Sequence, residues 1–166
     1  MEARYISSYM SEKVRTPSQI IQGGCATCLD STMLMAAVFA QAKYRPVIIL
    51  IPRHAFIGVM LKDEALKSTN VIEAPYVSVI TSISYLRNLV ELGQLLVLET
   101  TRLTRNATDQ IVSFDEAIEA AKGHLYAAPA LLPCALDVTQ VWNHGISSLS
   151  TTKEEAAPVI EQTEAN

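Results

Sequence analysis

The sequence predicts a single α+β domain in which a helical front half packs on a small antiparallel sheet. Asp30 to Ala42 is a mostly apolar run without glycine or proline, which predicts a buried central helix. Val47 to Ile51 and Ala55 to Leu61 are rich in β-branched and apolar residues and predict two adjacent strands, the first of them fully buried. Leu95 to Leu98 is a third strand candidate.

Three further helices are indicated by their boundaries. Thr16-Pro17 precedes a short helix, because proline is tolerated in the first helical turn, and Gly23-Gly24 ends it. Ser113 and Glu116 form a capping box that starts another helix. A third helix ends at Gly93 and is marked by apolar residues at helical spacing, namely Ile83, Leu86, Leu89 and Val90.

The length and composition of the chain limit its domain organisation. With 166 residues, of which about half are hydrophobic, the chain is large enough for one globular domain with a sizeable core. We place that domain at residues 1–150, with a polar segment up to Lys13 and a charged, turn-like segment from Lys62 to Asn70. Residues 151–166 are poor in large apolar groups and are expected to form a flexible tail.

The charge pattern excludes several function classes. The net charge is −4, and no cluster of Lys and Arg forms a basic stripe, so a direct nucleic-acid partner is not expected. The apolar stretches are far shorter than the ~20 residues of a spanning helix. The N-terminus lacks a secretory signal pattern, and three cysteines cannot all pair within one chain. A reducing, cytoplasmic location without a membrane partner is therefore the expectation.

Cys28 is the first candidate for a functional residue because it stands at the predicted start of the central helix. The unpaired backbone N–H groups and the dipole at a helix N-terminus favour the anionic thiolate. A thiolate is the nucleophile of cysteine catalysis. The alternative is that Cys28 is a small buried hydrophobe, which is the usual role of a lone cysteine.

A thiol nucleophile needs a base and an acid that orients the base, and the sequence offers both. His54 lies at the head of one predicted strand, and Glu99 lies at the end of another, directly before Thr100-Thr101. A helix start that meets two neighbouring strand ends brings Cys28, His54 and Glu99 to one point. The alternatives are a core or rim histidine and a surface carboxylate. Asp30 is interpreted as structural, since an acid in the first turn complements the helix dipole.

These segments resemble the transglutaminase-like superfamily, which shares the papain-like fold. The resemblance is carried by Thr27-Cys28-Leu29-Asp30, Arg53-His54-Ala55-Phe56 and Leu98-Glu99-Thr100-Thr101. In that superfamily a cysteine starts the central helix, a histidine stands in a His-Ala-aromatic context, and an acid precedes a threonine on the following strand. The acid there is more often aspartate than glutamate.

The resemblance extends to a bacterial subgroup found beside helicase-like and nuclease-like modules in large proteins. Arg15-Thr16-Pro17 and Leu136-Asp137-Val138 are similar to strings of that subgroup, so the likeness covers most of residues 14–146. Two departures stand out: the subgroup usually has glycine where this chain has Arg53, and Cys25 has no counterpart.

The resemblance implies a cysteine-dependent acyl-transfer or amide-hydrolysing enzyme that acts on peptide or protein amides without a metal or organic cofactor. Cys28 would attack the carbonyl carbon, His54 would exchange the proton, and Glu99 would orient the imidazole ring. The backbone N–H of Cys28 and the Gln22 carboxamide would bind the oxyanion; the alternative for Gln22 is a solvated glutamine at a helix end. The chain would then act alone or as part of a larger multidomain protein or complex.

Three alternatives remain open. Gln22 to Cys28 also resembles the cysteine segment of papain-like proteases, with His144 in place of His54. Cys25-Ala26-Thr27-Cys28 is a Cys-x-x-Cys pair, which suits redox chemistry or half of a zinc site completed by Cys134 with His124 or His144. Finally, the fold can serve as a catalytically inactive interaction or regulatory module, because fold does not imply activity.

Overall fold

The computed structural model describes residues 14–62, 71–74, 77–103, 112–127 and 134–143, and their arrangement confirms the α+β class. In chain order the elements are α1 (Pro17–Gly23), α2 (Cys28–Gln41), β1 (Arg45–Ile51), β2 (His54–Met60), β3 (Val71–Ala74), β4 (Val77–Ile80), α3 (Ile83–Glu91), β5 (Leu95–Leu98), the short 3-10 helix η2 (Thr100–Arg102), α4 (Phe114–Ala127), β6 (Cys134–Asp137) and α5 (Val138–Asn143).

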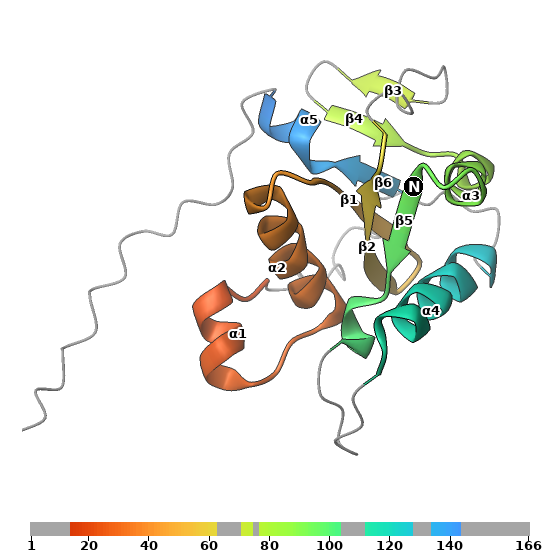
Figure 1. Ribbon diagram of the computed structural model, residues 1–166. Helices are drawn as coiled ribbons and strands as arrows, with labels where there is room; N and C mark the ends of the chain where they lie inside the picture. The colour runs from red at the N-terminus through yellow and green to blue at the C-terminus, as the bar shows by residue number, and fades with distance from the viewer. Residues whose placement is uncertain (1–13, 63–70, 75–76, 104–111, 128–133, 144–166) are drawn as a thin grey trace, which may run out of the picture.

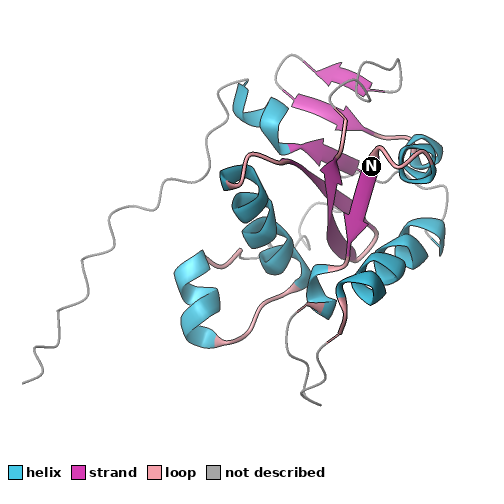
Figure 2. Ribbon diagram, in the orientation of Figure 1, coloured by secondary structure: helices cyan, strands magenta, loops and turns pink. Residues whose placement is uncertain are grey.

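The strands form one six-stranded sheet in the order β3-β4-β6-β1-β2-β5, and every neighbouring pair is antiparallel. Figure 2 shows the strands in magenta between the helices. β1 and β2 form a hairpin that closes at the pair Ile51 and His54. The two turn residues are Pro52 and Arg53, and Arg53 has a φ of 65°. Proline followed by a positive φ is the pattern of a type II turn.

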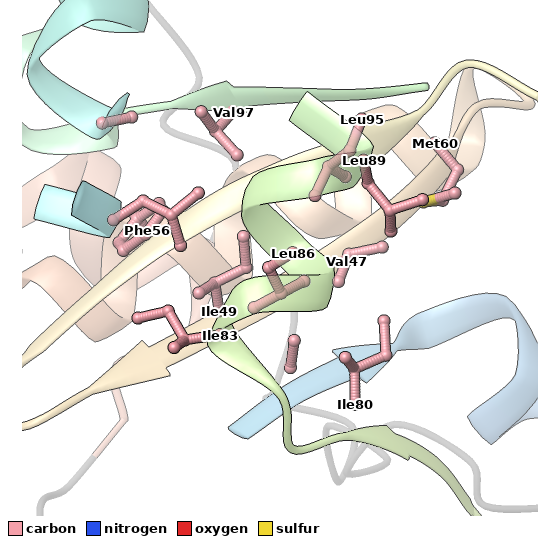
Figure 3. Close-up of a cluster of buried hydrophobic side chains, with 13 residues drawn as sticks. Val47, Ile49, Phe56, Met60, Ile80, Ile83, Leu86, Leu89, Leu95 and Val97 are labelled. Carbon is pink, nitrogen blue, oxygen red and sulfur yellow. The ribbon is translucent and has the colours of Figure 1, made fainter. Parts of the chain in front are cut away.

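Side chains alternate between the two faces of the sheet, and each face has its own apolar cluster. Figure 3 shows the larger cluster, in which Leu86 and Leu89 of α3 pack on the sheet. Its fully described members are Val47, Ile49, Phe56, Met60, Ile80, Ile83, Leu86, Leu89, Leu95, Val97, Ala121, Leu125 and Ala135. The second cluster joins α2 to the opposite face and contains Ala36, Ile48, Ile57, Leu98, Ala117 and Val138.

The helices therefore form a layer on each side of the sheet. Figure 1 shows α1 and α2 to the left of the sheet and α3 and α4 to the right. α4 runs beside the edge strand β5 and contributes to both clusters, with Ala117 in one and Leu125 in the other. This position brings α4 to the same sheet edge as the end of β5.

The predicted helix boundaries agree with the observed caps. The Thr16 side chain accepts a hydrogen bond from the backbone N–H of Gln19, and Gly24 ends α1 with a φ of 60°. At α4, Ser113 and Glu116 form the capping box, with the Ser113 hydroxyl accepting from the Glu116 backbone N–H at 3.2 Å and the Ser113 backbone N–H donating to the Glu116 carboxylate at 2.8 Å. The strands predicted at 47–51, 55–61 and 95–98 correspond to β1, β2 and β5.

The prediction of a buried central helix is wrong. α2 begins at Cys28, as predicted, but its outer side chains are open to solvent, with Met33 42% and Val38 51% exposed. The residues that α2 buries are mainly polar, since Asp30, Ser31 and Thr32 are covered while Ala36 is the apolar contact. A helix packed on one face of a sheet needs only one covered stripe, so apolar residues elsewhere on it do not indicate burial. β1 likewise is fully buried only in its centre, and Leu50 and Ile51 are half-buried.

Some elements are not predicted from the sequence, and some predictions lie outside the described residues. β3, β4 and β6 extend the sheet beyond the three predicted strands, and α5 is an additional helix. The N-terminal segment up to Lys13, most of the charged segment from Lys62 to Asn70 and the tail at 151–166 belong to the parts that the structure does not describe. None of the described helices has the length and apolar content needed to cross a bilayer.

Gly58 provides a test of the packing between β2 and β5. A Cβ at this position would lie 2.8 Å from Leu95 Cδ1 and 3.3 Å from Ile49 Cδ1, and both side chains are fully buried. We expect Gly58→Ala to lower the free energy of unfolding by about 1–2 kcal/mol through overpacking. Urea unfolding of the two proteins measures the difference.

Gly123→Ala is the matched control, because a Cβ there meets nothing within 4 Å and the position is inside α4. It should stabilise the protein by up to about 1 kcal/mol, since alanine is the better helix former. Equal effects of the two substitutions would contradict the close contact at Gly58.

Candidate functional site

The candidate site begins at the first turn of α2, which Thr27 caps. The Thr27 hydroxyl accepts from the Asp30 backbone N–H at 3.2 Å, and the Asp30 carboxylate accepts from the Thr27 backbone N–H at 2.9 Å. Cys28 is therefore the first residue of a 14-residue helix, where backbone N–H groups have no partner within the helix. The Cys28 side chain is half-buried.

Asp30 fixes this helix start to the segment before α1. Its carboxylate is 1% exposed and accepts from the Arg15 backbone N–H at 2.8 Å and from Arg15 Nη1 at 2.7 Å. Burial alone would raise the pKa of Asp30, but the hydrogen bonds from Thr27 and Arg15 outweigh it and lower the pKa to about 2. The interpretation of Asp30 as a structural residue is consistent with these contacts.

Hydroxyl groups connect the start of α2 to the residue that follows Glu99. The Thr32 hydroxyl donates to the carbonyl of Cys28 at 2.7 Å and lies 3.2 Å from the Thr100 hydroxyl. Thr100 in turn donates to the Ser31 hydroxyl at 3.2 Å. All three threonine and serine side chains are buried. These bonds hold the first turns of α2 against η2.

Glu99 is a buried carboxylate at the end of β5, with 1% of its surface exposed. Its Oε1 atom accepts from the backbone N–H of Thr101 at 3.0 Å and from the Thr101 hydroxyl at 2.7 Å. Burial acts to raise the pKa of Glu99, but hydrogen bonds from His54 and Thr101 outweigh it, so the pKa lies below its usual value. The alternative that Glu99 is a surface carboxylate is therefore wrong.

His54 is the partner of Glu99, at the first position of β2. Its Nε2 atom lies 2.6 Å from Glu99 Oε2, its ring stacks on Phe56, and 21% of the side chain remains exposed. An ionised carboxylate only accepts hydrogen bonds, so the contact assigns a proton to Nε2. In the neutral ring the lone pair is then on Nδ1.

His124 of α4 is a third member of this group, and the sequence reasoning did not place it there. Its Nε2 atom lies 3.3 Å from Glu99 Oε2, and its ring centroid lies 4.5 Å from that of His54. In the sequence, the apolar stripe of Ala117, Ala121 and Leu125 indicates that His124 lies near the packed side of a helix. That stripe does not say which strand the helix faces.

The structure joins His54 to Glu99 by a hydrogen bond, whereas no hydrogen bond joins Cys28 to either of these two described side chains. His54 shares a face of β2 with Phe56, which belongs to the α3 and α4 side, whereas α2 packs on the opposite face. Among the described residues, the group of His, Cys, Asp and Glu side chains that approach one another within 4.8 Å is His54, Glu99 and His124, without Cys28. Cys28 is linked to Glu99 indirectly, through Thr32 and Thr100.

The other sequence candidates lie apart from this group. Gln22 is exposed on α1, and Cys25 is exposed in the loop before α2. Cys134 lies on β6 opposite Leu50, and burial raises the pKa of its thiol. A zinc site built from Cys134 and His124 is not assembled in the described part of the chain, where His124 instead adjoins Glu99. His144 lies outside the described residues.

Fold and site together define an α+β protein in which a buried glutamate pairs with a partly exposed histidine at one end of an antiparallel sheet. Comparisons of this chain with protein-family models, with curated proteins and with solved structures find no match.

The acid sensitivity of the α2 start follows from Asp30. The pKa of Asp30 is about 2 in the folded protein, against 3.8 for the ordinary group. The ionised carboxylate therefore stabilises the fold at pH values above 3.8, and this stabilisation is lost as the pH falls towards 2. We expect Asp30→Asn to lower the free energy of unfolding near neutral pH by about 1–2 kcal/mol, allowing for solvent at the exposed Arg15. The difference from wild type should shrink between pH 4 and pH 2 in denaturant titrations.

Asp115→Asn is the matched control, because Asp115 is an exposed acid in the first turn of α4. It should change the unfolding free energy by less than about 0.5 kcal/mol. A pH-independent loss in Asp30→Asn would contradict the role of the ionised carboxylate.

Proposed function

We propose that the protein is a cysteine-dependent amide hydrolase or acyltransferase in which Cys28 is the nucleophile, His54 the base and Glu99 the acid that orients the base. The observation that carries the proposal is the 2.6 Å contact between His54 Nε2 and Glu99 Oε2. The order Cys28, His54, Glu99 resembles the Cys-His-acid order of the transglutaminase-like superfamily, and this resemblance supplies the proposed reaction class. Peptide or protein amides are the proposed substrates.

The orientation of His54 supports this assignment. The Glu99 carboxylate accepts a hydrogen bond from His54 Nε2, so the lone pair that can accept a proton is on Nδ1. The carboxylate itself is fixed by Thr101 through its other oxygen. A buried acid held in this way keeps the ring in one tautomer and stabilises the imidazolium that forms during the reaction.

The helix start supports the role of Cys28. The N-terminus of a helix stabilises a thiolate through its dipole and its unpaired N–H groups. The Cys28 backbone N–H is one such group and is the proposed donor to the oxyanion. Gln22 is the proposed second donor, and its exposed position on α1 requires α1 to approach the substrate.

The proposed reaction transfers the Cys28 thiol proton to His54 Nδ1, and the sulfur forms a bond to the carbonyl carbon of the amide. Collapse of the tetrahedral intermediate breaks the carbon–nitrogen bond, and His54 returns the proton to the leaving amine. Water or a second amine then attacks the thioester carbon while His54 accepts a proton from the attacking group. The carbon–sulfur bond breaks, the acyl product leaves, and His54 returns the proton to the Cys28 sulfur. Glu99 remains ionised throughout.

Cys28 and His54 must approach each other for the first step. The proposal places this approach in the substrate complex, because catalytic hydrogen bonds are often formed only there. The hydroxyl contact between Thr32 and Thr100 holds the start of α2 beside the end of β5, so the proposal assigns the approach to the Cys28 and His54 side chains rather than to movement of α2.

Alkylation of the three cysteines by a mild electrophile at neutral pH, in the presence of a chelator and followed by mass spectrometry, tests the proposal. Cys28 should react at least about tenfold faster than exposed Cys25, because a general base contributes 10²–10⁴-fold when it is aligned. His54→Ala should remove this advantage, and Glu99→Gln should reduce it. Circular dichroism checks that each variant is folded.

Cys25→Ala is the matched control, since it removes a thiol three residues away and should leave the rate at Cys28 unchanged. If Cys28 reacts at the same rate in wild type and in folded His54→Ala, His54 does not activate the thiol. The inactive interaction module would then be the better description.

A further inference from the structure

His124 has no role in the proposed acyl transfer, yet it faces the same carboxylate oxygen as His54. We propose that His54, Glu99 and His124 bind one divalent first-row transition-metal ion, for which Zn²⁺ is the representative. Cys28 is not a ligand in this arrangement, so the inference does not rest on the proposed acyl transfer.

The donor atoms are two imidazole nitrogens and one carboxylate oxygen. Zinc accepts this combination in catalytic sites, and two histidines with one carboxylate also hold non-haem iron(II). Three protein ligands leave at least one coordination position for water. The donor set therefore favours an open transition-metal site over a calcium or magnesium site, which requires mainly oxygen ligands.

The distances are close to those of a metal-bound group. The three donor atoms all lie within 4.8 Å of one another. Zinc–ligand bonds of about 2.0–2.1 Å at tetrahedral angles place neighbouring donors about 3.3 Å apart. His124 Nε2 and Glu99 Oε2 already lie 3.3 Å apart, whereas His54 Nε2 lies 2.6 Å from the same oxygen and must withdraw by about 0.7 Å.

The surroundings hold the ligands in place. Thr101 binds the Oε1 atom of Glu99 through its backbone N–H and its hydroxyl, which leaves Oε2 directed at both histidines. Buried Phe56 lies against both imidazole rings, with centroid distances of 6.1 and 6.2 Å. Such fixed outer contacts are typical of metal sites, where they orient the ligands.

The location also suits a cation. Glu99 is buried, and a metal ion at its oxygen compensates the buried negative charge. His124 lies in the last turn of α4, where the carbonyl end of the helix dipole favours positive charge. The site is accessible because His124 is 45% exposed.

Metal binding and the His54–Glu99 hydrogen bond exclude each other, because both use His54 Nε2. The metal would take the place of the proton that now joins the two side chains. For this reason the alkylation test of the proposed function uses a chelator.

Calorimetric titration of the full chain with Zn²⁺ tests the proposal. A Cys25→Ala/Cys28→Ala double variant removes the two neighbouring thiols and should still bind one ion. His124→Asn in that background should weaken the affinity at least about 100-fold, since loss of an outer contact alone costs 10–100-fold. Co²⁺ in the same site should absorb without a sulfur-to-cobalt charge-transfer band.

His144→Asn is the matched control, because it makes the same change at the remaining histidine of the chain, and it should leave the affinity unchanged. Absence of a one-to-one site in the double variant, or equal affinity after His124→Asn, would overturn the metal site. Either result would leave the alkylation experiment unaffected, so the two proposals fail separately.

Discussion

The burial of Glu99 is the constraint on which the rest of the site depends. A carboxylate that is 1% exposed loses its hydration, and the loss is tolerated only when donors replace the water. Thr101 supplies two donors from the next residues of the chain, and His54 supplies a third from the neighbouring strand. The direction of the His54 ring is therefore a consequence of satisfying a buried charge at a strand end.

Two other buried carboxylates join elements in a similar manner. Asp30 links the start of α2 to Arg15. Asp137, at the end of β6, contacts Arg45 at 2.6 Å and accepts from the backbone N–H groups of Thr139 and Gln140 in α5. In each case one acid caps a helix and also pairs with a distant arginine. Each of these acids therefore couples a local helix start to a residue elsewhere in the fold. The coupling is the more deeply buried at Asp137, because Arg45 is 16% exposed whereas Arg15 is 43% exposed.

Local signals in the sequence account for the correct predictions, and non-local packing accounts for the failures. The capping box at Ser113 and the β-branched run of β1 act over a few residues, so they are readable in the sequence. β3, β4 and β6 have four residues each and mix apolar with polar or small side chains, so they are not distinguished from loops in the sequence. β5 is equally short but wholly apolar, which is why it is readable as a strand. The pairing of His54 with Glu99 followed from strand ends that neighbour each other. His124 could not be added, because its position depends on α4 lying beside β5.

The turn before His54 restricts what can stand at the rim of the site. Arg53 has a φ of 65°, a left-handed conformation that costs a residue with a side chain about 1–2 kcal/mol. Glycine takes this conformation without strain, and asparagine takes it more readily than most residues. At position 53 we therefore expect glycine, asparagine or a long unbranched residue to be tolerated, and valine or isoleucine, which are β-branched, to be strained. The backbone conformation of the turn thus limits which side chains position 53 accepts without strain.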